Sequence, residues 1–113
     1  MRLLLIKSYL LRKKRHYVAL EKHKQVFEGY VLKISFCKSP FLVSKLGISV
    51  SRKCGKAVLR NRFKRQIKEI YRIYRNELIY PVNLNIRPNC SLQSISFEMI
   101  KQDFLTFLTD LTH

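Results

Sequence analysis

Acidic side chains are scarce in this chain. Its 113 residues include seven Asp and Glu against 23 Lys and Arg, which gives a formal net charge of +16. The few acids form no close pair that could share a metal ion, and the sequence has no Gly-rich loop for a nucleoside triphosphate. A catalytic site built from protein side chains alone is therefore not expected.

Cysteine is also sparse, with Cys37, Cys54 and Cys90 giving an odd count and no CxxC pair. This pattern predicts neither a disulfide framework nor a zinc site, and it favours a reducing, cytoplasmic location. The three histidines show no spacing typical of metal ligands. We expect no metal site and no organic cofactor in the protein itself.

No apolar run is long enough to cross a bilayer, which takes about 20 residues. The most apolar stretch, residues 3–11, is interrupted by Lys7 and Ser8, and the basic cluster RKKR follows it. A signal peptide or a membrane-surface segment is a weaker interpretation of this stretch. We interpret residues 1–10 as an N-terminal extension and residues 11–113 as one domain that has no membrane partner.

The chain does have enough hydrophobic residues for a core, at 47%, and a lopsided distribution of charge. Residues 1–75 hold 21 Lys and Arg and three Asp and Glu, whereas residues 76–113 hold two and four. A charge of this size destabilises a compact state by self-repulsion, so we expect it to serve binding. The natural partner is a polyanion, and nucleic acid is the commonest polyanion.

Residues 52–75 are the most informative stretch, because ten of the 24 are Lys or Arg and Glu69 is the one acid among them. Apolar residues recur in it at steps of three and four, which predicts an amphipathic helix over about residues 57–76. The apolar stripe consists of Leu59, Phe63, Ile67, Ile70 and Tyr74. A basic stripe recurs at steps of four, at Arg60, Lys64, Lys68 and Arg72. Such a helix packs on a core with one side and presents cations with the other.

The remaining pattern predicts short strands over residues 30–38, 44–52 and 82–86, a helix over 12–20 and a final amphipathic helix over 96–111. Tyr30 is expected to share the core face of its strand with Leu32, and Val31 to lie on the other face. In the last helix Ser96 is expected as the N-cap, and Asp103 as a solvated residue. This order, helix–strand–strand–helix–strand–helix with room for one more strand, predicts an α+β, two-layer sandwich with a small mixed sheet.

Two consecutive segments carry a family resemblance. GISVSRK at residues 47–53 and GKAVLRNRFKRQIKEIYR at residues 55–72 resemble the signature of the bacterial ribonuclease P protein subunit. LRKKRHY at residues 11–17, the strand at 30–34, IRP at 86–88 and the last helix are similar to that family in the same order. The resemblance covers roughly residues 11–110.

The resemblance implies that the protein joins ribonuclease P RNA and that the complex removes the 5′ leader of precursor tRNA. It implies that the RNA supplies the active site and holds most of the Mg²⁺, and that the protein alone is inactive. It also implies a left-handed βαβ crossover, whereas general chirality rules predict the opposite hand.

The helix that opens with Arg60-Asn61-Arg62 is the element that binds the catalytic RNA in this family. By match, the resemblance assigns this role to Arg52, Lys53, Arg60, Asn61, Arg62, Lys64, Arg65 and Lys68. Arginine suits the role because its planar fork can bridge two phosphate oxygens.

The family threads the 5′ leader between its first helix and the open face of the sheet. The resemblance assigns this role to Arg12, Lys13, Tyr17, Val31, Lys33, Ser35, Ser49 and Ser51. Tyr17 either stacks on a leader base or packs in the core. Ser49 and Ser51 lie either beside a ligand or on an ordinary solvent face.

Two other classes of protein stay open from the residues alone. A ribosomal or other structural RNA-binding protein without processing activity would share this composition. A DNA-binding regulator is a weaker interpretation, because no helix-turn-helix pair precedes the basic helix. All three neutralise phosphates, so the identity of the bound nucleic acid separates them and salt dependence does not. The oligomeric state is not predicted.

Overall fold

The structure is a computed structural model that describes residues 24–39 and 43–111. The predicted helix at residues 12–20, with Arg12, Lys13 and Tyr17, lies outside the described residues. The described chain forms strands β1 (Gln25–Glu28), β2 (Leu32–Lys38), β3 (Lys45–Ile48) and β4 (Val82–Pro88), and helices α3 (Ala57–Tyr74) and α4 (Phe97–Leu111). Three short 3-10 turns are η1 (Arg52–Cys54), η2 (Arg75–Glu77) and η3 (Leu92–Ser94).

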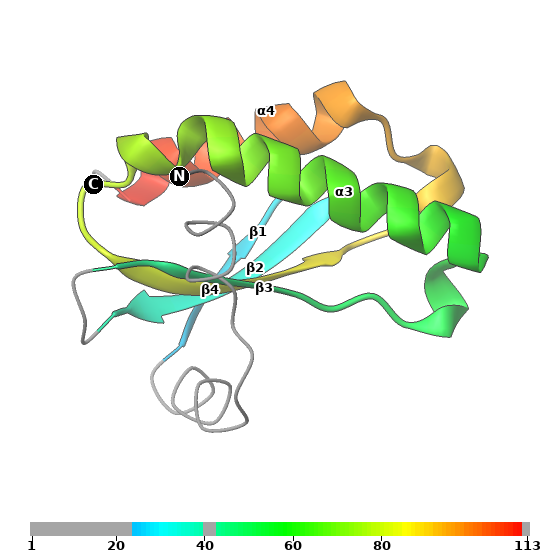
Figure 1. Ribbon diagram of the computed structural model, residues 1–113, viewed down its shortest axis with the longest axis horizontal. Coiled ribbons are helices and arrows are strands. Elements are labelled where there is room, and N and C mark those ends of the chain that lie inside the picture. The colour runs from blue at the N-terminus through cyan, green and yellow to red at the C-terminus, as the bar shows by residue number, and fades with distance from the viewer. Residues whose placement is uncertain (1–23, 40–42, 112–113) are drawn as a thin grey trace.

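The four strands form one mixed sheet in the order β1-β2-β4-β3. β2 pairs antiparallel with both β1 and β4, whereas β3 and β4 run parallel. Because α3 connects two parallel neighbours, β3, α3 and β4 form a βαβ unit; the hand of this crossover stays a prediction. Figure 1 shows α3 and α4 on the same side of the sheet, which confirms the α+β class with helices on one face.

The core lies between that sheet face and the two helices. Register places Ile34 opposite Ile86 and Leu46 opposite Leu84, and all four side chains are buried. From α3, the predicted stripe supplies Phe63, Ile67 and Ile70, while Leu59 and Tyr74 pack against the core as partly buried residues; Tyr71, which the stripe left out, is buried as well. From α4 the core receives Ile100, Phe104, Phe107, Leu108 and Leu111. The Ser96 hydroxyl accepts a hydrogen bond from the Met99 amide at 3.2 Å, which confirms the predicted N-cap.

The predicted alternation of side chains between the two faces of the sheet fails at the turn before β2. Tyr30 is 92% exposed, whereas Val31 is 2% exposed and belongs to the core, so the predicted orientations of both residues were wrong. The reason is that β2 begins at Leu32, and the two preceding residues lie in the bend that leaves β1. Pleat alternation holds within a strand and does not extend through a turn.

The prediction that Asp103 is solvated was also wrong. This residue of α4 is 4% exposed. Its carboxylate accepts hydrogen bonds from the backbone amides of Tyr30 (3.2 Å), Val31 (2.8 Å) and Leu32 (2.9 Å). Three amide donors replace the water that a buried carboxylate gives up.

Candidate nucleic-acid interface

Helix α3 begins without a capping side chain. Its N-cap is Lys56, which makes no side-chain hydrogen bond to the helix, and the first turn contains no acidic residue. The first amides of a helix have no partner within the helix, and the helix dipole makes this end positive. A capping Asp or Ser would offset both effects. The start of α3 is therefore suited to an anion from outside the chain.

Cations surround this helix start. Arg52, Lys53, Asn61, Arg62, Arg65 and Lys68 are exposed, and Arg60 and Lys64 are half-buried. We call these eight residues the α3 basic surface. Within residues 24–39 and 43–111, no carboxylate lies within ion-pair distance of any of its seven cations. All eight residues that the resemblance assigned to RNA binding thus lie on η1 or α3, and none of them is fully buried.

The second half of α3 differs in its electrostatics. Arg72 donates two hydrogen bonds to the Glu69 carboxylate, at 2.6 and 3.2 Å. The hydrogen bond and the positive charge of Arg72 lower the pKa of Glu69 below its ordinary value of 4.5. The α3 basic surface, whose cations have no carboxylate partner among the described residues, thus ends at Lys68, before the Arg72–Glu69 pair.

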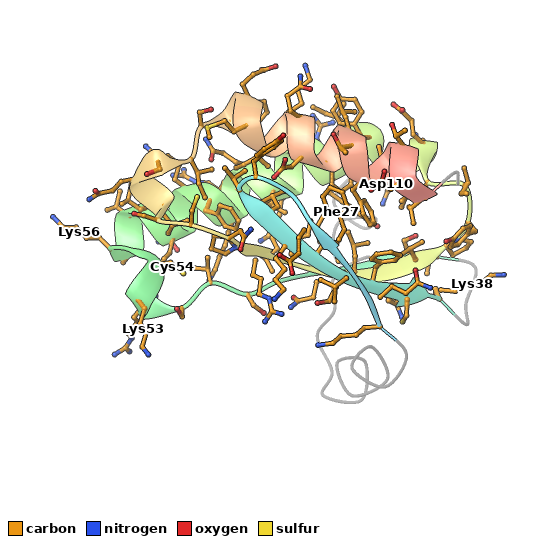
Figure 2. All side chains as sticks on the ribbon, turned by 180° about the vertical axis from the view of Figure 1, so that it is seen from behind. Phe27, Lys38, Lys53, Cys54, Lys56 and Asp110 are labelled. Atoms are coloured by element: carbon orange, nitrogen blue, oxygen red, sulfur yellow. The ribbon has the colours of Figure 1, made fainter. Side chains whose placement is uncertain are left out.

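Side chains at this end of the molecule project outward. Figure 2 shows Lys53 and Lys56 pointing away from the body on the side where α3 begins, with Lys38 at the opposite end. Exposed cations on a short turn and on the adjoining helix can contact a polyanion without rearrangement of the core.

Arg60 is the exception among the arginines of this surface. It is half-buried, and its Nε donates a hydrogen bond to the backbone carbonyl of Gly55 at 3.2 Å. One edge of its guanidinium is therefore engaged within the protein, whereas Arg62 and Arg65 are exposed.

The residues predicted for the 5′ leader are not brought together in the same way. Lys33 is half-buried and lies 4.0 Å from a carboxylate oxygen of Glu28. Ser49 and Ser51 are exposed, and the Ser49 hydroxyl lies 3.3 Å from Oδ1 of Asn85. Val31 is in the core, so its predicted place on an open face was wrong. Ser35 is 3% exposed, so its hydroxyl does not lie on an open surface either.

Strand β4 supplies polar residues that the sequence analysis missed. Register pairs Lys33 with Arg87, Ser35 with Asn85 and Cys37 with Asn83, so these side chains share the face that turns away from the helices. We call Lys33, Ser35, Asn83, Asn85 and Arg87 the polar sheet face. The signal was present in VNLNIR at residues 82–87, where apolar and polar residues alternate.

Two buried polar atoms on this face have no hydrogen-bond partner among the described residues. Within the described part of the chain, neither Oδ1 of Asn83 nor Nε of Arg87 has a hydrogen-bond partner. The first is an acceptor and the second a charged donor, and leaving either buried and unpaired costs free energy.

No three His, Cys, Asp or Glu side chains come together among the described residues in a way that could hold a metal ion. Cys37, Cys54 and Cys90 are free, and burial raises the pKa of the Cys37 thiol. No described helix has the length and hydropathy of a membrane span.

The chain is similar to known proteins. Residues 5–112 match the family described as Ribonuclease P. The ribonuclease P protein component of Desulfatibacillum aliphaticivorans is 38% identical over 81 residues, which cover 71% of this chain and 68% of that protein. The protein component from Clostridioides difficile is 42% identical over 71 residues, covering 63% and 62%. The chain thus matches about two thirds of the length of these curated relatives.

A solved structure of a similar protein resembles this chain as well. The RNase P protein from Thermotoga maritima superposes with a TM-score of 0.78 at 27% identity, covering 89% of this chain and 96% of that one. The similarity therefore extends to the arrangement of the sheet and helices.

Proposed function

Since the chain belongs to the ribonuclease P family, as the protein component of the ribonucleoprotein that processes the 5′ end of precursor tRNA, we propose that its α3 basic surface binds ribonuclease P RNA. The observation that carries this proposal is the uncompensated charge of the α3 basic surface. Seven cations there have no carboxylate partner among the described residues, although the protein repels itself at +16.

The chemistry of the surface suits a phosphate backbone. Arg62 and Arg65 are exposed and can each bridge two phosphate oxygens, while Lys53 and Lys64 act as point charges. Asn61 lies between two arginines and can both donate and accept a hydrogen bond. The uncapped start of α3 adds amide donors and a positive dipole.

The 5′ leader of precursor tRNA lies on the other side of the sheet in our proposal. The half-buried Lys33, Asn85 and Arg87 of the polar sheet face, together with Ser49 and Ser51, would contact the leader there, with Arg12, Lys13 and Tyr17 contributing from outside the described residues. Lys33 and Arg87 supply positive charge that suits phosphate oxygens of the leader. Contacts directed at the backbone suit a subunit that meets many leader sequences.

Catalysis itself belongs to the RNA in this proposal. Mg²⁺ ions are held mainly by the RNA, because a protein of charge +16 with seven acids repels divalent cations. The protein contributes by binding and orienting its polyanionic partners, and it has no hydrolytic activity alone. We also propose a cytoplasmic location, in keeping with the free cysteines.

A binding titration with labelled ribonuclease P RNA tests the main assignment. The R62A/R65A double variant is expected to bind at least roughly tenfold more weakly, because each arginine offers charge-assisted hydrogen bonds. Lys38→Ala is the matched control, since Lys38 is exposed and lies at the opposite end of the molecule (Figure 2). Equal affinities of R62A/R65A, K38A and the unmodified protein would contradict the proposal.

A further inference from the structure

Arg60 contacts the chain that precedes its helix. Its Nε donates to the carbonyl of Gly55 at 3.2 Å, and its backbone amide donates to the carbonyl of Lys56 at 3.0 Å. Both hydrogen bonds run from the first turn of α3 back to the entry of the helix. Arg62 and Arg65 lie further along the same helix and are exposed.

The contact reaches the turn that carries two cations of the α3 basic surface. Gly55 closes the η1 turn by donating its amide to the carbonyl of Arg52 at 3.3 Å. The Arg60 guanidinium is therefore connected, through one residue, to the turn that presents Arg52 and Lys53. Both of these side chains are exposed.

The η1 turn has other contacts at Cys54, whose side chain packs against the core as a partly buried residue and whose amide donates to the Ser51 carbonyl at 3.1 Å. None of its three residues is fully buried, and the Ser51 side chain makes no capping hydrogen bond, although its hydroxyl lies 3.5 Å from the Cys54 thiol. Core packing therefore fixes α3 through the buried Phe63 and Ile67, whereas it holds η1 through the partly buried Cys54. A side-chain bond from the rigid helix to Gly55 supplies an anchor for this turn.

We infer that Arg60 is a positioning residue, which holds the η1 turn so that Arg52 and Lys53 face the same RNA surface as Arg62 and Arg65. The inference rests on the proposed function of the α3 basic surface and deepens it. Cations that are ordered before binding lose less conformational entropy when the RNA arrives. The first arginine of the Arg60-Asn61-Arg62 motif thus acts mainly through geometry, and the second through direct charge.

Lysine cannot replace Arg60 in this role. A lysine side chain keeps the positive charge but has no Nε–H in the position that meets the Gly55 carbonyl. Arg60→Lys therefore separates the hydrogen bond from the charge. It is also a mild change for the fold, because Arg60 is half-buried and both side chains have long aliphatic stems.

The test is a double-variant cycle on affinity for ribonuclease P RNA. Arg60→Lys is expected to weaken binding roughly tenfold in the unmodified protein, but less than twofold in the R52A/K53A background, where there is nothing to position. Arg65→Ala is the comparison, and it should weaken RNA binding by the same factor in both backgrounds. Hydrogen exchange should become faster at the Gly55 amide in R60K and stay unchanged in α4.

Two results would overturn the inference. One is that R60K binds RNA as tightly as the unmodified protein; the other is that it loses the same factor in both backgrounds, which would make Arg60 an independent ligand. Failure of the proposed function gives a different result. In that case R52A/K53A and R65A, which leave Arg60 intact, would bind RNA with unchanged affinity.

Discussion

The Asp103 carboxylate fills the space that a side chain on Gly29 would need. A Cβ at Gly29 would approach the carboxyl group of Asp103 more closely than van der Waals contact allows. The same carboxylate binds the amides of Val31 and Leu32 at 2.8 and 2.9 Å. Helix α4 is thus tied to the beginning of β2 across some seventy residues of sequence.

Asp103→Ala should destabilise the fold strongly. Two fully buried amides and one partly buried amide would lose their acceptor, and an unsatisfied buried donor costs about 1–3 kcal/mol. We expect a loss of about 3 kcal/mol in the free energy of unfolding, measured by urea titration. Asp110→Ala is the control on the same helix, because Asp110 is exposed. A midpoint for D103A equal to that of D110A would refute this account.

Gly29→Ala should also destabilise, and for a reason that depends on Asp103. The added methyl group forces the carboxylate away from the amides it binds. In a D103A background this clash disappears, so the second substitution should cost much less there. Thermal unfolding of both single variants and of the double variant measures this coupling. Additive losses would mean that Gly29 and Asp103 act independently.

Arg65 and Arg72 form a matched pair for RNA binding. They lie seven residues apart, which is about two turns of α3, and both are exposed. Arg72 is engaged by Glu69, whereas Arg65 has no carboxylate partner among the described residues. Arg65→Ala is therefore expected to weaken RNA affinity roughly tenfold, and Arg72→Ala by less than about threefold. RNA-binding titrations of both variants in the same buffer test this expectation. A larger loss of RNA affinity for Arg72→Ala than for Arg65→Ala would contradict the assignment.

The salt dependence of RNA affinity should report the number of phosphate contacts. Each neutralised phosphate contributes about 0.7–0.9 to the slope of log affinity against log salt concentration. The R62A/R65A variant should therefore lower that slope by about 1.4–1.8. Lys38→Ala should leave it within error of the unmodified protein. An unchanged slope in R62A/R65A would mean that these arginines do not contact phosphate.

A substitution at Tyr17, which lies outside the described residues, tests the leader assignment. If its ring stacks on a leader base, Tyr17→Ala should lower precursor tRNA affinity of the holoenzyme by about 1–3 kcal/mol. Mature tRNA has no leader, so its affinity should not change. Equal losses for precursor and mature tRNA would instead indicate a structural role for Tyr17.

Much of the fold followed from periodicity. The apolar stripe of α3 and the N-cap at Ser96 were predictable, because both depend on local spacing and local hydrogen bonds. Local spacing also predicted the basic stripe at Arg60, Lys64 and Lys68, whereas the other residues of the α3 basic surface were assigned by the family resemblance. Strand β1 was missed because its four residues, QVFE, are mostly exposed and show no clear alternation.

What stayed hidden depends on contacts that are distant in sequence. Asp103 looked like a solvated residue because its amide partners lie about seventy residues away. The hydrogen bond from Arg60 to Gly55 spans five residues, but a basic stripe does not reveal which arginine turns inward. That Lys33 and Arg87 share one face of the sheet can be predicted only when the pairing of β2 with β4 is known.

The most direct test of the central claim is cleavage of precursor tRNA by the cognate ribonuclease P RNA at low Mg²⁺, with and without this protein. The account predicts strong stimulation at the correct 5′ site, much weaker stimulation by R62A/R65A, and no cleavage by the protein alone. Folded, RNA-binding protein that leaves the cleavage rate unchanged would contradict the account, and α3 would then be a phosphate-binding helix without a part in tRNA processing.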